Sequence, residues 1–182
     1  PLCSGSYTPT LTYNHGCTTT VPVTVSEPSA LSIVTQNSTN VSCFNGSNGT
    51  ITVLAAGGTG ILQYTIGGVS QFNGNFASLA ANNYTVTVTD ANNCMITAGP
   101  CTITQPTAII VNSVYTTPVT FYGGNDGTVT VNVSGGTPGY VYTSMGVSVT
   151  NGLFTGVPAG SFTITITDAN SCSQTYNPAV VT

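Results

Sequence analysis

The sequence of 182 residues contains no lysine, no arginine and no tryptophan, and it has a single histidine. Four acidic residues leave it with a formal net charge of -4. Because no basic side chain is present to neutralise phosphate, we exclude nucleic acid as a partner. The same absence removes arginine clamps and lysine bases from any catalytic site. Serine, threonine and asparagine must supply the polar surface instead.

Long hydrophobic runs are absent as well. No stretch of about 18 apolar residues occurs, so we expect no membrane insertion. No signal peptide precedes the first strand pattern, and the chain starts inside a repeat, so we expect a mature piece or a fragment of a longer array. A hydrophobic content of 40% is nevertheless enough to build a core.

One stretch of the chain occurs three times. Residues 84–94 (Tyr-Thr-Val-Thr-Val-Thr-Asp-Ala-Asn-Asn-Cys) return as residues 162–172 and, more loosely, as residues 7–17. In each copy an aromatic residue and a cysteine stand ten positions apart, and apolar residues alternate with threonine between them. This alternation predicts a half-buried strand, and Asp-Ala-Asn predicts the turn that ends it. Pro9 stands where the second copy has Val86, which predicts a weaker strand or an edge strand there.

The copies divide the chain into an incomplete repeat, residues 1–28, and two whole repeats, residues 29–106 and 107–182. The whole repeats align without a gap at an offset of 78 residues. Each contains about seven short alternating strands between glycine turns, and neither shows a helical period. We therefore predict an all-β chain of tandem immunoglobulin-like antiparallel β-sandwich repeats arranged end to end. A β-solenoid is the alternative, but its coils would need a much shorter internal period.

The strands of the first whole repeat are expected near these residues: 31–42, 49–55, 61–66, 69–72, 75–79, 83–89 and 95–104. Leu79 to Tyr84 resembles the corner of such sandwiches, at which a tyrosine hydroxyl binds an upstream backbone group. Phe162 takes this position in the last repeat and lacks the hydroxyl.

Taken together, these features resemble the SprB repeat, a module of very large surface adhesins in gliding and related Bacteroidetes bacteria. In the first whole repeat the resemblance rests on residues 41–53 (Val-Ser-Cys-Phe-Asn-Gly-Ser-Asn-Gly-Thr-Ile-Thr-Val), 57–59 (Gly-Gly-Thr), Tyr64, 83–94 and 103–106. In the last repeat it rests on residues 124–131, 135–138 and 140–142. The resemblance implies secretion, an extracellular location and a role in adhesion or surface fibres, and it implies no catalytic residues. Phe121 replaces the early cysteine of the last repeat.

Six cysteines in a chain rich in threonine, serine and asparagine are typical of an oxidising, extracellular setting. All six are candidates for disulfides: Cys3, Cys17, Cys43, Cys94, Cys101 and Cys172. A metal site is the rival interpretation. The absence of a Cys-x-x-Cys motif and the isolation of His15 disfavour it.

Several pairings of these cysteines remain open. If repeats stack end to end, Cys43 approaches Cys172. Stacking likewise brings Cys3 towards Cys94. In this topology Cys43 and Cys94 lie at opposite ends of one sandwich, too far apart for a disulfide. If the topology differs, Cys43 pairs with Cys94 inside one repeat. A local bridge from Cys94 to Cys101 is another alternative, and free thiols are the last.

Side-chain oxygens gather in three turns: Asp90-Ala-Asn92, Asp168-Ala-Asn170 and Asn125-Asp126. Calcium binding would need about six to eight oxygens, commonly including several carboxylates. Each turn offers one carboxylate, so we favour turn capping and predict no metal and no cofactor. His15 has no dependable partner, and Asp90 and Asp168 are a full repeat apart. We therefore predict that the chain is not an enzyme.

Six Asn-x-Ser/Thr sequons are candidates for glycosylation: Asn37, Asn40, Asn45, Asn48, Asn83 and Asn132.

We predict a secreted structural repeat protein that forms a stalk, fibre or adhesin on a bacterial surface. Its partners would be other copies of itself or neighbouring repeats of a longer chain. A strand or half-repeat from a neighbouring chain could complete residues 1–28 and so build a filament. The alternative is a carbohydrate-binding module that binds surface glycans through Tyr122, Tyr140 and Tyr142, although we favour core positions for these tyrosines.

Overall fold

The computed structural model describes residues 3–182, and every regular element among them is a β-strand. The all-β fold class is therefore confirmed. Residues 3–182 include no helix of the length and hydrophobicity that crossing a membrane requires. The described residues form two compact units. Unit 1 comprises residues 3–36, Val53–Gly74 and Thr85–Gly99; unit 2 comprises Asn37–Thr52, Asn75–Tyr84 and Pro100–Thr182.

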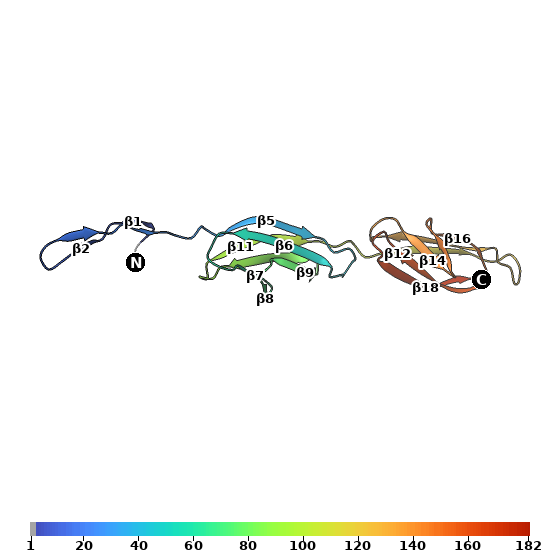
Figure 1. Ribbon diagram of the computed structural model, residues 1–182. Coiled ribbons are helices and arrows are strands. Elements are labelled where there is room, and N and C mark those ends of the chain that lie inside the picture. The colour runs from blue at the N-terminus through green and yellow to red at the C-terminus, as the bar shows by residue number, and fades with distance from the viewer. Residues whose placement is uncertain (1–2) are drawn as a thin grey trace. The chain divides into compact units, whose positions relative to one another are not determined.

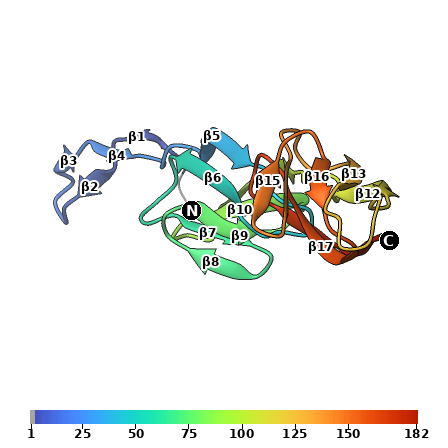
Figure 2. The ribbon, with the colours of Figure 1, turned by 90° about the vertical axis from the view of Figure 1, so that its right-hand side faces the viewer.

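Four short strands form two antiparallel ladders at the start of unit 1 (Figure 2). Strand β1 (Gly5–Tyr7) pairs with β4 (Val23–Val25), and β2 (Thr10–Thr12) pairs with β3 (Thr18–Thr20). Strands β1 and β2 together take the place of the repeated aromatic strand, which is continuous in the two whole repeats. The interruption includes Pro9, as expected for a residue that cannot donate to a ladder.

Seven antiparallel strands follow in the first whole repeat, close to the predicted positions: β5 (Ser32–Thr39), β6 (Gly49–Ala56), β7 (Gln63–Ile66), β8 (Val69–Gln71), β9 (Asn75–Leu79), β10 (Asn82–Thr89) and β11 (Met95–Ile103). One sheet has the order β5-β6-β9 and the other β11-β10-β7-β8. All of these strands except β10 are labelled in Figure 1. Residues of β6 alternate between buried and accessible, with Ile51 and Val53 at most 2% exposed. This alternation is the one that a strand with a single buried face requires.

The last repeat builds the same arrangement from β12 (Ile110–Thr117), β13 (Gly127–Ser134), β14 (Val141–Ser144), β15 (Val147–Val149), β16 (Leu153–Val157), β17 (Gly160–Thr167) and β18 (Ser173–Val181). Its sheets have the orders β12-β13-β16 and β15-β14-β17-β18. Two antiparallel sheets of three and four strands in this order are immunoglobulin-like. The predicted boundaries at residues 28 and 106 stay a prediction, because the two compact units are divided differently.

The core of the last repeat lies between its two sheets. The three-stranded sheet contributes Val129, Val131, Phe154 and Val157; the four-stranded sheet contributes Tyr142, Ile164, Ile166, Ala179 and Val181. Buried residues of the first whole repeat stand 78 positions earlier at eight of these nine places: Ile51, Val53, Phe76, Tyr64, Val86, Val88, Cys101 and Ile103. The periodicity of the sequence is therefore a periodicity of core positions.

The predicted tyrosine corner is present. The Tyr84 hydroxyl donates to the carbonyl oxygen of Ala80 at 3.0 Å, and the Tyr7 hydroxyl donates to that of Cys3 at 2.7 Å. Each bond reaches back four residues and holds the start of the aromatic strand against the preceding turn. Phe162 cannot form this bond, and its half-buried ring packs against the core of the last repeat instead.

Candidate functional site: the loops joined by Cys43 and Cys172

The turn between β17 and β18, residues 168–172, is organised by one carboxylate. Asp168 is 5% exposed; its Oδ1 accepts the N–H groups of Asn170 and Cys172, each at 2.9 Å, and its Oδ2 accepts the Thr137 N–H at 2.8 Å. Burial raises the pKa of this carboxyl, but the three N–H donors outweigh burial and hold the pKa below its usual 3.8. The ionised carboxylate thus fixes the backbone that carries Cys172.

Asp90 performs the same task in the turn between β10 and β11, residues 90–94. Its Oδ2 accepts the Thr59 N–H at 2.9 Å, and its Oδ1 accepts the N–H groups of Asn92 and Cys94 at 2.9 and 2.8 Å. The Thr59 bond, with the other two, lowers the pKa of Asp90 against the effect of burial. Both Asp-Ala-Asn turns therefore show the capping geometry that we favoured over calcium binding. Within residues 3–182, no three His, Cys, Asp or Glu side chains gather as metal ligands would.

The loop between β5 and β6, residues 40–48, presents Cys43 and Phe44. The Ser42 N–H donates to Asn48 Oδ1 at 3.0 Å, and Asn48 Nδ2 donates back to Ser42 Oγ at 2.8 Å. A further bond from the Gly46 N–H to the Cys43 carbonyl oxygen, at 3.0 Å, closes the tip. These three bonds, all within residues 40–48, hold the tip of the loop together.

The structure joins this loop to the 168–172 turn inside unit 2. Cys43 and Cys172 form a disulfide with their Cα atoms 5.6 Å apart, and Asn170 Nδ2 donates to the Ser42 carbonyl oxygen at 3.0 Å. Of the pairings left open by the sequence, this is the one expected between successive repeats. The bridge connects residues that are 129 positions apart.

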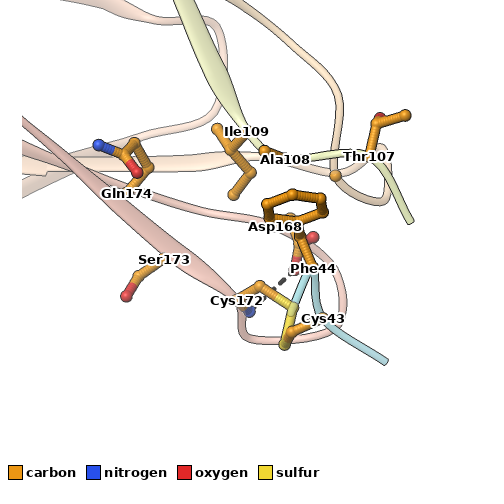
Figure 3. A pocket seen from close by; sticks show the side chains of 10 residues that line it. Cys43, Phe44, Thr107, Ala108, Ile109, Asp168, Cys172, Ser173 and Gln174 are labelled. Carbon is orange, nitrogen blue, oxygen red and sulfur yellow. Dashed lines mark hydrogen bonds between the residues drawn. A yellow bond between two sulfur atoms is a disulfide. The ribbon is translucent and has the colours of Figure 1, made fainter. Parts of the chain in front are cut away.

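Phe44 and the disulfide line one side of a pocket of about 240 Å³, which we call the Cys172 pocket (Figure 3). The residues that line it are Cys43, Phe44, Thr107, Ala108, Ile109, Gly136, Asp168, Cys172, Ser173 and Gln174. The Phe44 ring lies near Ala108 and Ile109 and is 48% exposed. The contact is thus one covalent bond, one hydrogen bond and one half-covered aromatic ring.

Four cysteines remain free among residues 3–182: Cys3, Cys17, Cys94 and Cys101. The alternative bridges from Cys94 to Cys3, Cys43 or Cys101 are absent. Cys43 is bonded to Cys172 instead. This agrees with a topology in which the β5–β6 loop, with Cys43, and the β10–β11 turn, with Cys94, lie at opposite ends of one sandwich. Cys101 cannot reach the exposed Cys94, because its side chain is 2% exposed and occupies the core position that Ala179 has in the last repeat. Burial also raises the pKa of the Cys101 thiol.

The three tyrosines considered for carbohydrate binding lie in different environments. Tyr142 is a core residue with a ring 6.4 Å from that of Tyr140, and burial raises the pKa of its hydroxyl. The Tyr140 hydroxyl donates to the Gly135 carbonyl oxygen. Tyr122, in the loop between β12 and β13, is fully exposed. The favoured core position therefore holds for Tyr142 and fails for Tyr122.

The remaining candidate residues lie on the surface. All six sequon asparagines are exposed: Asn37, Asn40, Asn45, Asn48, Asn83 and Asn132. Their glycosylation stays a prediction. His15 is exposed in the tight turn between β2 and β3.

The sequence interpretation missed two residues at the contact. Phe44 was seen only as part of a motif, although Tyr122 stands 78 positions later and shows that an aromatic residue recurs there. Asn170 was considered only as a turn former or calcium ligand, although Asn92 repeats it. Aligning the repeats position by position would have marked both places.

Comparison with known proteins agrees with this repeat structure. The family model described as SprB repeat matches residues 35–70 and 113–143, one segment in each whole repeat. The predicted resemblance to the SprB repeat is therefore confirmed at these two segments. No curated protein matches the chain significantly.

Among solved structures, one match is to the extracellular domains 3–5 of Drosophila OTK. It has a TM-score of 0.32 and 16% sequence identity, and it covers 98% of this chain and 70% of that chain. The SprB matches, together with the disulfide, support a repeat protein of a cell surface.

Proposed function

We propose that this chain is a secreted structural repeat protein that acts as a stalk, fibre or adhesin segment on a bacterial surface. The observation that carries the proposal is the Cys43–Cys172 bridge between two SprB-type repeats. A covalent bond between successive modules resists their separation, which a purely catalytic or ligand-binding domain does not need. The proposal assigns no catalytic step to the chain and no nucleic-acid partner.

The incomplete repeat supports a more specific form of this proposal, in which a filament grows by strand complementation. Val88 and Cys101 are core residues of the first whole repeat, at most 2% exposed. Their counterparts in the hairpin of residues 5–25 are Leu11 and Val23, which are 53% and 45% exposed. Within residues 3–182, no other sheet covers these two side chains of the hairpin. Strands from another copy or a neighbouring repeat would cover them.

Electron microscopy of the native material tests this proposal. Long filaments of regular repeat, lost when Leu11 is changed to Asn, would support growth by strand complementation. The matched control is Val34→Asn, which alters a residue that is 54% exposed on β5. Monodisperse single chains at high concentration would remove the filament, and failure to detect the protein outside the cell would remove the surface role.

A second candidate function, glycan binding, rests on Tyr122. This fully exposed ring is next in sequence to Phe121, which is 65% exposed, so one loop offers two accessible aromatic side chains to a sugar. Glycan-array binding that is lost in Tyr122→Ala would favour this candidate. The control is Tyr115→Ala, since Tyr115 is 66% exposed on β12 and lies outside that loop.

A further inference from the structure

A second pocket of about 180 Å³ repeats the Cys172 pocket at the first whole repeat. We call it the Cys94 pocket; it is lined by Pro28, Ser29, Ala30, Leu31, Gly58, Thr59, Asp90, Asn92 and Cys94. Ala30, Leu31, Gly58, Asp90 and Cys94 stand 78 positions before Ala108, Ile109, Gly136, Asp168 and Cys172 of the Cys172 pocket. All residues of the Cys94 pocket belong to unit 1.

The backbone of the two pockets is held by corresponding hydrogen bonds. The Gly58 N–H donates to Ser29 at 2.7 Å, as the Gly136 N–H does to Thr107 at 2.9 Å. The Asp90 N–H donates to the Cys94 carbonyl oxygen at 3.0 Å, and the last repeat has the same bond at 2.9 Å. The Cys94 pocket is therefore built in its receptive shape before anything enters it, which lowers the entropic cost of binding.

The two pockets differ in what covers them. Cys43 and Phe44 line the Cys172 pocket, and Cys43 is bonded to the cysteine there. In the described part of the chain no cysteine–aromatic loop lines the Cys94 pocket, and Cys94 is a free, exposed thiol. Phe121 and Tyr122 of the last repeat correspond to Cys43 and Phe44, but they include no thiol.

We propose that the Cys94 pocket is a docking site for the cysteine–aromatic loop of another SprB repeat, which it fastens through a disulfide to Cys94. The aromatic ring would lie near Ala30 and Leu31, as Phe44 does near Ala108 and Ile109. Asn92 would bind the loop backbone, as Asn170 binds Ser42. The inference rests on the proposed function only for the identity of the partner, a further repeat of this kind.

Closure of the bond converts two thiols to one disulfide. Cys94 and the incoming cysteine lose two protons and two electrons in all. A disulfide of a thiol oxidoreductase in the oxidising compartment accepts them and becomes a dithiol. Exchange with an already activated disulfide needs no separate oxidant, since the Cys94 thiolate attacks the activated cysteine sulfur and expels its leaving group.

That exchange provides the test. The probe is a peptide with the sequence of residues 40–49, Asn-Val-Ser-Cys-Phe-Asn-Gly-Ser-Asn-Gly, whose cysteine carries a 2-thiopyridyl group. The full chain, with its Cys43–Cys172 bridge intact, is treated with this peptide, and the modified cysteines are identified by peptide mapping. We expect Cys94 to react about tenfold faster than Cys17. The reason is that the pocket beside Cys94 would cover part of the aromatic ring of the peptide, and that burial is worth about this factor in affinity. Cys17 is the matched control, because it is also exposed but its turn has no aspartate.

Two variants separate recognition from simple thiol reactivity. A peptide with Phe→Ala should lose the preference for Cys94, and the chain with Leu31→Asn should lose it too, whereas Val34→Asn should keep it. Equal rates at Cys94 and Cys17, or a preference that survives the Phe→Ala peptide, would overturn the proposal. Neither result depends on whether the native material forms fibres, so failure here is distinguishable from failure of the proposed function.

Discussion

At the residue scale, the two buried aspartates show how a chain with few charges uses them. Asp90 and Asp168 each accept three backbone N–H bonds and sit in the turn before a cysteine. The third example, Asp126, accepts the N–H and hydroxyl of Thr120 at 3.0 and 2.6 Å. Three of the four acidic residues therefore shape turns, and the chain has no lysine or arginine to pair with them.

Replacing Asp168 with asparagine tests this role. An amide keeps two acceptor bonds through Oδ1 but turns an NH2 group towards the Thr137 N–H, which loses its partner. We expect the free energy of unfolding in urea to fall by about 1–3 kcal/mol. Asp126→Asn is the matched control, since Asn48 occupies this place in the first whole repeat and makes the equivalent bonds. It should leave the free energy of unfolding nearly unchanged. Equal costs for both variants would contradict the assignment.

The dependence of stability on pH follows from the same carboxyls. The pKa values of Asp90, Asp126 and Asp168 all lie below 3.8 in the folded chain. Their contribution is therefore fully present above the unfolded pKa and is lost as pH falls through the folded values. We expect the thermal midpoint to be flat from about pH 7 to pH 5 and to fall below about pH 4. Without lysine or arginine, repulsion between cations cannot cause that fall, and a midpoint unchanged at pH 2.5 would refute this account.

At the element scale, the strands were predictable because they depend on local signals. Alternation with a period of two and glycine turns placed all seven strands of the first whole repeat close to the observed β5 to β11. The partner of Cys43 was not predictable in this way, since it depends on a contact 129 residues away. Cys101 is a free, buried thiol, and its neighbours in sequence do not reveal that it faces the core.

The glycine that follows the second strand of each whole repeat, Gly57 or Gly135, gives a direct test at the scale of elements. Gly135 has φ +79°, and a Cβ there would lie 1.8 Å from the Ala108 carbonyl oxygen; Gly57 is alike, with φ +82° and 2.0 Å to Ala30. The close approach places Ala108, which precedes β12, against the turn after β13. Any side chain at either glycine must therefore displace the segment that lines a pocket.

We expect Gly135→Ala to lower the free energy of unfolding by about 3 kcal/mol or more, because it combines a left-handed backbone with a steric clash. Gly146→Ala provides the control, since Gly146 has a similar φ of +76° but no atom lies within 4 Å of the added Cβ. That variant should cost only about 1–2 kcal/mol. Urea-induced unfolding measures both, and indistinguishable values would show that the clash is relieved cheaply.

At the scale of the whole molecule, the disulfide decides which residues can be extended by a pull on the two ends of the chain. Cys43 precedes β6, and Cys172 follows β17. Every strand from β6 to β17 therefore lies inside the covalent loop. A force applied at the termini passes directly from Cys43 to Cys172, and these strands carry none of it once the outer segments are taut. Only β1 to β5 and β18 lie outside the loop.

Single-molecule pulling on the two ends of the chain tests this consequence. Under oxidising conditions, the total extension should lack the residues between the bridged cysteines, which stand 129 positions apart. Reduction should release them and add on the order of 450 Å of contour length, at about 3.5 Å per extended residue. The double variant Cys43→Ser, Cys172→Ser should show the longer extension without reductant, whereas Cys94→Ser should keep the short one. An extension that does not respond to reduction would mean that the bridge bears no load, and the structural function proposed for this chain would lose its main support.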